Sequence, residues 1–352
     1  MISSPGQLPL TREELDAIER LSKRLADTAS HQNRVSSLRR AIEAQDSAAI
    51  GSLLDGGMDL HGPLYPLLLI KECFDEVQRL YEKLGISDEV RDATLFDIRR
   101  WADEHSARSG GELGLCQVYW IARHLSGRIV QLGSLQYELK PFAYPYRIYR
   151  ERGQSEPLLL AEGGLHLSRE GYLVQEAHSV YTTLLEEDGI SISAYEVDTR
   201  GGRIKESRST WMRPELSLLC TSETEVLNIH IPKGTDLRDE AVAASLSLSE
   251  EMFPHHGVMV CTSWLLDPAL SAVLDGESNI IRFMQRFSKF PVTFSVAQIW
   301  ERVFGFGFDV EEVLAFTPQT SLQRRTQDAL RSGVVFRTMG GVVLSRGASA
   351  LC

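Results

Sequence analysis

The chain has 352 residues, of which 43% are hydrophobic and 24% charged, a composition typical of a soluble globular protein that buries a full core. Its 48 acidic and 37 basic residues give a formal net charge of −11, which argues against a nucleic-acid-binding surface. The length favours two domains, because a domain usually has roughly 100 to 200 residues.

Cysteine usage and hydropathy indicate a cytoplasmic protein. The five cysteines are scattered, and no two have the CxxC spacing. This pattern provides neither a zinc site nor a disulfide framework and suits the reducing cytosol. The N-terminus shows no signal peptide, and apolar runs such as residues 64–70 fall far short of the about 20 residues that a membrane helix needs. We therefore expect no metal and no membrane partner.

The first third of the chain has the pattern of amphipathic helices. Residues 11–14 resemble a capping box, and apolar residues then recur every three or four positions. Similar apolar faces follow, for example at residues 35–42 and 68–84, and the last predicted helix ends at residue 125. Such helices bury their apolar faces against one another. Residues 1–125 are therefore predicted to form a helical bundle that serves as a scaffold.

Strand patterns replace helical ones from residue 128 onward. Residues 128–139, 144–149 and 190–197 combine alternation with β-favouring side chains. We therefore place the domain boundary at residue 125, and we expect residues 126–352 to form a second domain whose main sheet begins with the strand at 128–139.

The C-terminal segment has weaker signals. Two amphipathic helices are predicted, at residues 296–304 and 321–330. Two short apolar stretches, residues 334–336 and 342–344, flank Gly340 and its neighbours and predict a small hairpin.

Residues 226–287 predict alternating strands and helices. The predicted strands are 226–231 and 258–266, and the predicted helices are 237–253 and a segment that contains 278–287. Two strands separated by one helix favour parallel neighbours joined by a right-handed crossover. Strand-end loops and helix N-termini then meet at one edge, where backbone N–H groups can hold a phosphate. The pattern suits a cofactor that carries phosphates.

Several segments resemble a bacterial family of acyltransferase domain-containing proteins. They are His230 to Gly234, Val260 to Pro268, Ser278 to Phe283, Gly85-Ile86, Thr94 to Ile98 with Trp101, Gly114-Leu115 and Leu132 to Glu138. In that family a helical N-terminal domain precedes a domain similar to the GCN5-related N-acetyltransferases (GNAT). The resemblance implies an α+β fold, with an N-terminal helical bundle followed by a GNAT-like mixed-sheet domain.

His230 and Cys261 are the candidate catalytic residues. The resemblance implies that His230 lies on a strand lining the acyl-transfer cleft, where an imidazole can take a proton from an attacking amine. A histidine on an apolar strand can also be an ordinary hydrogen-bonded core residue. Cys261, on the neighbouring predicted strand, is either a nucleophile activated by His230 or a buried structural cysteine. We expect both residues to approach one cleft.

Lys233 and Gly234 are the candidate cofactor-binding residues. They occupy the loop at which the resemblance implies binding of the coenzyme A pyrophosphate, although the superfamily pattern Q/RxxGxG/A is missing. Pro232 lacks an N–H donor and only one glycine is present. Lys233 either supplies the missing positive charge or is a solvated loop residue. An acyl-carrier protein is therefore an alternative donor to acyl-CoA.

Four further residues are candidates for substrate binding. Asn279 and Arg282 lie one turn apart at the start of a predicted helix, so Asn279 can orient a substrate while Arg282 pairs with a carboxylate or phosphate. Ser278 as an N-cap explains the same sequence locally. Gln136 and Trp264 are expected in the same cleft, although a tryptophan beside two leucines is usually a core residue.

Together these features predict an acyltransferase that moves an acyl group from an acyl thioester to a small-molecule or peptide amine. The expected mechanism is direct attack, with His230 as the base and backbone N–H groups of its strand polarising the thioester carbonyl. Two alternatives remain: a Cys261-dependent acyltransferase, and a non-catalytic protein that binds an acylated ligand or partner.

Overall fold

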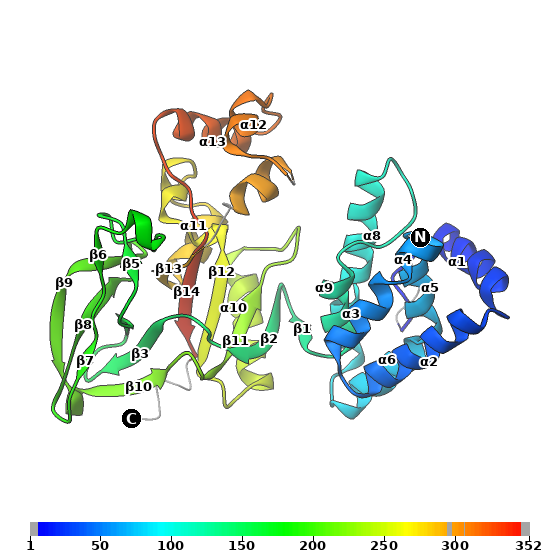
Figure 1. The fold of residues 1–352 in the computed structure, drawn as a ribbon, viewed down its shortest axis with the longest axis horizontal. Helices are drawn as coiled ribbons and strands as arrows, with labels where there is room; N and C mark the ends of the chain where they lie inside the picture. The colour runs from blue at the N-terminus through cyan, green and yellow to red at the C-terminus, as the bar shows by residue number, and fades with distance from the viewer. Residues whose placement is uncertain (1–5, 294–297, 306, 346–352) are drawn as a thin grey trace. The chain divides into compact units, whose positions relative to one another are not determined.

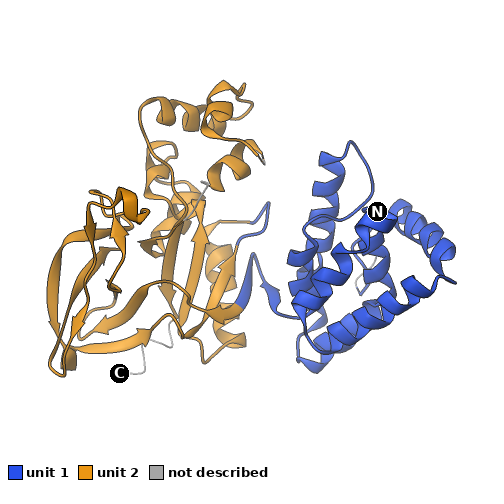
Figure 2. Cartoon of the chain, viewed as in Figure 1, with its two compact units in different colours: residues 1–138, 231–235 blue, residues 139–230, 236–352 orange. Residues whose placement is uncertain are grey.

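The computed structural model describes residues 6–293, 298–305 and 307–345. Two compact units divide the chain, one of residues 1–138 and 231–235 (unit 1) and one of residues 139–230 and 236–352 (unit 2) (Figure 2). In the described ranges no helix is long and apolar enough to cross a bilayer. The same ranges contain no group of three His, Cys, Asp or Glu side chains arranged to hold a metal ion.

Unit 1 is built mainly of helices. They are α1 (Arg12–Leu25), α2 (Ala29–Glu43), α3 (Ser47–Asp55), α4 (Met58–His61), α5 (Tyr65–Glu72), α6 (Phe74–Lys83), α7 (Asp88–Leu95), α8 (Asp97–Arg108) and α9 (Val118–Leu125). The predicted capping box is present, because the Thr11 side chain accepts from the Glu14 N–H and Glu14 accepts from the Thr11 N–H. No strand forms among the described residues before Gly110, as predicted.

The strand predicted at residues 128–139 is a hairpin instead. It consists of β1 (Ile129–Leu132) and β2 (Leu135–Pro141), which pair antiparallel. Gly133 has a φ of 62°, and this left-handed backbone allows the chain to reverse within two residues.

Four neighbouring strands in unit 2 include the two strands of the predicted strand–helix alternation. Their order is β11 (Glu225–His230), β12 (Val258–Ser263), β14 (Met339–Leu344) and β13 (Ser288–Pro291), with β11 and β12 parallel and the other neighbours antiparallel (Figure 1). Helices α10 (Asp239–Met252) and α11 (Asn279–Gln285) accompany them. Strand β12 ends at Ser263, earlier than predicted, because Ser263 caps the 3₁₀ turn η3 (Trp264–Leu266).

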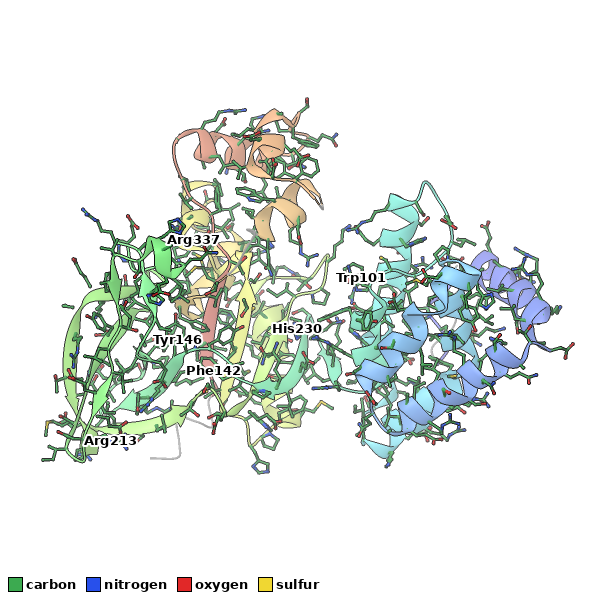
Figure 3. The ribbon with its side chains drawn as sticks, viewed as in Figure 1. Trp101, Phe142, Tyr146, Arg213, His230 and Arg337 are labelled. Carbon is green, nitrogen blue, oxygen red and sulfur yellow. The ribbon has the colours of Figure 1, made fainter. Side chains whose placement is uncertain are left out.

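A second, antiparallel sheet in unit 2 is formed by the chain between β2 and β11. Its strands are β3 (Tyr146–Glu151), β4 (Pro157–Ala161), β7 (Glu186–Glu187), β8 (Ser191–Asp198), β9 (Arg203–Met212) and β10 (Leu216–Cys220), with β5 (His166–Leu167) and β6 (Tyr181–Thr182) as a small separate pair. Two short 3₁₀ turns lie in the same segment, η1 (Glu176–His178) and η2 (Arg213–Glu215). Phe142 and Tyr146 belong to the apolar core that the two sheets share (Figure 3).

The C-terminal segment agrees with the prediction only in part. It contains η4 (Pro268–Ala272), the π-helical turn η5 (Trp300–Phe304), α12 (Val310–Ala315) and α13 (Ser321–Arg331). Residues 296–297 of one predicted helix lie outside the described residues. The predicted hairpin is wrong, because Gly340 and Gly341 lie inside the single strand β14. A Cβ at Gly340 would overlap the Phe290 ring, so this glycine allows close packing rather than a turn.

Candidate active site

Strands β11 and β12 are parallel neighbours, as predicted. The last pair of their ladder joins Ile229 to Cys261. The next residue of each strand, His230 and Thr262, therefore points to the opposite face of the sheet. That face packs on the second sheet, because Val260, which alternates with Cys261, lies in the core between the sheets. His230 is half-buried at the end of β11 (Figure 3).

The prediction that His230 and Cys261 approach one cleft is wrong. Their offset of one residue in a parallel ladder puts the two side chains on opposite faces. Cys261 is 1% exposed and shares its face with Met259, which accepts a hydrogen bond from Ser249 of α10. Burial raises the pKa of the Cys261 thiol to about 12. This thiol is therefore not prepared to act as a thiolate nucleophile.

Thr262 is bound by Tyr144, a residue that the sequence analysis missed. The two hydroxyl groups share a hydrogen bond. The Tyr144 ring packs edge-on against Phe142 and Phe290, with centroids 5.1 Å away in both cases. Burial raises the pKa of the Tyr144 phenol, which keeps it neutral at physiological pH. In the sequence Tyr144 only begins the predicted strand 144–149, within the aromatic-rich stretch from Phe142 to Tyr146, and no motif marks it.

The backbone at Ala143 sets the direction of Tyr144. Its φ of 54° lies in the left-handed region, which costs a residue with a Cβ roughly 1–2 kcal/mol. The Ala143 N–H donates to the Ser222 carbonyl at 3.1 Å, and the Phe142 N–H donates to the Thr224 carbonyl at 2.9 Å. These two bonds hold the strained turn. Strain of this kind persists where the surrounding structure fixes it, often at functional sites.

Asn228 is a second residue that the sequence analysis missed. It lies two positions before His230 on the same face of β11 and is 4% exposed. Its Nδ2 has no hydrogen-bond partner among the described residues. Buried amide groups are normally satisfied, because leaving one without a partner is costly. Asn228 therefore offers a donor that a carbonyl oxygen of a ligand can use.

The loop after β11 forms a tight turn that belongs to unit 1. Gly234 has a φ of 78°, and Thr235 donates both its N–H and its hydroxyl to the Pro232 carbonyl. The Nζ of Lys233 lies 2.9 Å from a carboxylate oxygen of Glu104, while 83% of the lysine side chain is exposed. The positive φ of the turn accounts for the single glycine.

The remaining predicted binding residues lie on three different elements. Gln136 is fully buried in the part of β2 that belongs to unit 1. Trp264 begins η3 and packs with apolar residues of η4, α11 and η5. Asn279 and Arg282 are exposed on α11, and Arg282 donates to Glu277 at 2.5 Å. Trp264, Asn279 and Arg282 therefore do not join Tyr144 and Thr262 in the packing between the two sheets.

Two family models match the chain. The family described as "GNAT-like C-terminal domain" matches residues 129–343, and the family described as "N-acyltransferase N-terminal domain" matches residues 7–127. Among curated proteins none matches.

Solved structures with a similar fold include two acyltransferase complexes. An acyltransferase mutant in complex with octanoyl-CoA is 19% identical, with a TM-score of 0.55 over 96% of this chain and 89% of that chain. An acyltransferase in complex with decanoyl-CoA and teicoplanin is also 19% identical, with a TM-score of 0.53 over 97% of this chain and 90% of that chain.

Proposed function

The chain belongs to the family in which an N-acyltransferase N-terminal domain precedes a GNAT-like C-terminal domain, and on this basis we propose that it transfers an acyl group from acyl-CoA to an amine. The observation that carries the proposal is the half-buried His230 at the end of the parallel β11–β12 ladder. Residues 1–125 and 126–352 remain the proposed limits of the two domains.

His230 acts as the general base in the proposed reaction. The amine attacks the thioester carbonyl, its nitrogen forms the new C–N bond, and one amine proton passes to the imidazole. The C–S bond then breaks, and coenzyme A leaves as a thiolate that takes up the proton held by the imidazolium, which returns His230 to its neutral form. Backbone N–H groups of β11 and the Asn228 side chain donate to the carbonyl oxygen as it gains negative charge. Cys261 has no role in this mechanism.

Lys233 and Gly234 are the proposed contacts for the coenzyme A phosphates. The ion pair of Lys233 with Glu104 is exposed on the lysine side, and such pairs contribute only about 0–1 kcal/mol. A phosphate can therefore replace Glu104 as the partner of Lys233 at a small cost in free energy. Because the turn has a single glycine, an acyl-carrier protein remains the alternative donor.

Arginine residues beside helix α10 form a second proposed contact region for the donor. The N-terminus of α10 is itself a weak anion site, because Asp239 and Glu240 occupy its first turn. Arg286 compensates for part of this negative charge, since it donates to Asp239 at 2.5 Å. Arg282 is a proposed phosphate partner, with Asn279 beside it on α11. Its side chain is exposed and donates to Glu277 at 2.5 Å, an exposed pair that a phosphate can replace.

The acceptor is a small-molecule or peptide amine in this proposal. An acyltransferase with a similar fold binds teicoplanin together with decanoyl-CoA, which supports a small-molecule or peptide acceptor. Trp264 remains a proposed acceptor contact, whereas Gln136 is fully buried within unit 1 and is not accessible to an acceptor.

The experiment that tests the function is thioester cleavage. Purified protein is mixed with decanoyl-CoA and a panel of amine-bearing glycopeptides, peptides and small amines, and free thiol is measured with a disulfide reagent while mass spectrometry identifies the amide. Acceptor-dependent thiol release with a matching amide product is expected. Binding of decanoyl-CoA without thiol release across the whole panel would favour the non-catalytic binding protein. A parallel reaction with decanoyl-acyl-carrier protein distinguishes the two donors.

A further inference from the structure

A cavity of about 420 Å³ lies in unit 2 next to Tyr144. Its apolar walls include Pro145, Leu165, Leu173, Val174 and Val292. None of its lining residues is Asp, Glu, Lys or Arg. A cavity of this size falls within the roughly 300–1,000 Å³ range of small-molecule sites.

Hydrogen bonds hold the cavity walls in place. Thr183 is buried, and its hydroxyl donates to the Glu162 carbonyl at 2.6 Å and accepts from the Leu165 N–H at 2.9 Å. The Val174 N–H donates to the His166 carbonyl at 3.0 Å. These bonds tie the segments that carry Leu165, His166 and Val174 to one another and to Thr183.

Tyr144 connects the cavity to the end of β12. Its side chain lines the cavity, and its hydroxyl bonds Thr262. Thr262 and His230 are the residues that follow the last ladder pair of β12 and β11, and both point to the face toward the second sheet. Tyr144 is therefore shared by the cavity lining and the end of β12, one strand away from His230.

The chemistry of the lining identifies the occupant. Phosphates of coenzyme A need basic partners, and a charged amine acceptor needs a carboxylate, but the lining offers neither. Its histidine, His166, is already bonded to the Thr182 hydroxyl at 3.3 Å. Leu165, Leu173 and Val292 are half-buried and continue the apolar core between the two sheets. An uncharged, flexible hydrocarbon fits these walls.

We infer that this cavity holds the hydrocarbon tail of a medium-chain acyl donor and thereby sets the length of the acyl group. The inference rests on the proposed function, since the thioester end of the chain must lie near His230. Each methylene group that leaves water on binding contributes about 0.8 kcal/mol, or about fourfold in affinity.

The test uses substitutions that change the cavity volume. Val174→Phe fills the cavity, Val174→Ala enlarges it, and Val180→Phe is the matched control, because Val180 is 60% exposed and does not line the cavity. Isothermal titration of the full-length protein with coenzyme A, acetyl-CoA, decanoyl-CoA and dodecanoyl-CoA measures chain-dependent affinity without requiring an acceptor. Circular dichroism melts confirm that each variant folds.

We expect wild type and Val180→Phe to bind decanoyl-CoA more tightly than acetyl-CoA. In Val174→Phe the loss of about two buried methylene groups should reduce decanoyl-CoA affinity by about 15-fold with acetyl-CoA affinity unchanged. Val174→Ala should shift the preference toward dodecanoyl-CoA. The inference is overturned if chain length has no effect in wild type, or if both Val174 variants fold and keep the wild-type chain profile. Chain-dependent binding without thiol release in the thioester assay would instead reject the proposed function alone.

Discussion

The Tyr144 hydroxyl bonds the Thr262 hydroxyl, and this contact joins the turn that enters the second sheet to the end of strand β12. On the neighbouring strand the corresponding position is His230. The wall proposed for the acyl tail is therefore tied to the strand that lies beside the residue proposed for proton transfer.

His230→Ala should reduce acyl transfer by about 10²- to 10⁴-fold, because the general base is lost. The measurement is the rate of thiol release at saturating decanoyl-CoA and acceptor. The matched control is His256→Ala, since His256 pairs with Glu225 at the opposite end of the same strand. A folded His230→Ala protein with the wild-type rate would exclude His230 as the base.

Cys261 should resist alkylation in the native protein. Burial raises its pKa to about 12, so almost no thiolate forms at pH 8, and the side chain is inaccessible. Treatment with iodoacetamide followed by peptide mass spectrometry checks this, with the denatured protein as the positive control. Rapid native labelling that decanoyl-CoA blocks would restore the Cys261-dependent mechanism.

Ala143→Gly should stabilise unit 2 by about 0.5–1 kcal/mol. Glycine relieves the roughly 1–2 kcal/mol of left-handed strain, and its greater freedom in the unfolded chain offsets roughly 0.4–1 kcal/mol of the gain. Urea unfolding measures the change in the free energy of unfolding. Ala143→Val should destabilise the protein, because a β-branched residue tolerates a positive φ poorly. A lower stability for the glycine variant would contradict this account of the turn.

Gly340→Ala should destabilise the protein by about 1–3 kcal/mol, the usual cost of overpacking. The new Cβ meets the Phe290 ring, which packs on Tyr144. Gly189→Ala is the control, because no atom lies within 4 Å of a Cβ at that position. The free energies of unfolding of the two variants, measured together, decide the outcome. Equal stabilities would mean that the Phe290 ring moves aside freely.

Asp267 should make stability fall as the pH rises from about 4 to about 6. Burial raises the pKa of this carboxyl from 3.8 to about 6, although the backbone N–H groups of Arg337 and Ala269 donate to it. Between those two values the folded state retains a proton that the unfolded state has lost. The folded state is therefore favoured below pH 4, and about 3 kcal/mol of that advantage disappears as the pH passes 6.

The comparison with Asp267→Asn isolates this effect from other carboxylates. The difference in unfolding free energy between wild type and Asp267→Asn should change by about 3 kcal/mol over the same pH range, in the direction that disfavours wild type at the higher pH. A difference that stays constant with pH would show that Asp267 does not titrate in this way.

Local patterns predicted the elements of the site more reliably than their relative orientation. The alternation of strand and helix predicted that β11 and β12 are parallel neighbours. The faces of His230 and Cys261 depend on register, and a shift of one residue moves a side chain to the other face. Periodicity within one strand contains no information about that register.

Contacts between residues far apart in the chain explain the other differences between the predicted and the observed structure. Gly340 resembles a turn residue in sequence, but its neighbour Phe290 comes from another strand fifty positions earlier in the chain. Tyr144 and Asn228 belong to no sequence motif. The structure singles out Tyr144 by its hydrogen bond to Thr262 and Asn228 by its buried side-chain N–H group without a partner. Sequence spacing does not record such contacts.

The hydrogen bond between Phe142 and Thr224 also bears on how this protein can vary. The segment that builds the second sheet begins after β2 and ends before β11, and this bond holds its two ends together. A change in the length of the segment therefore changes the entropy of loop closure only slightly. Divergent members of the family can therefore remodel the cavity wall by insertion or deletion between β3 and β10 while the register of β11 on β12 stays the same. Chain-length preference and catalytic geometry can evolve as separate traits.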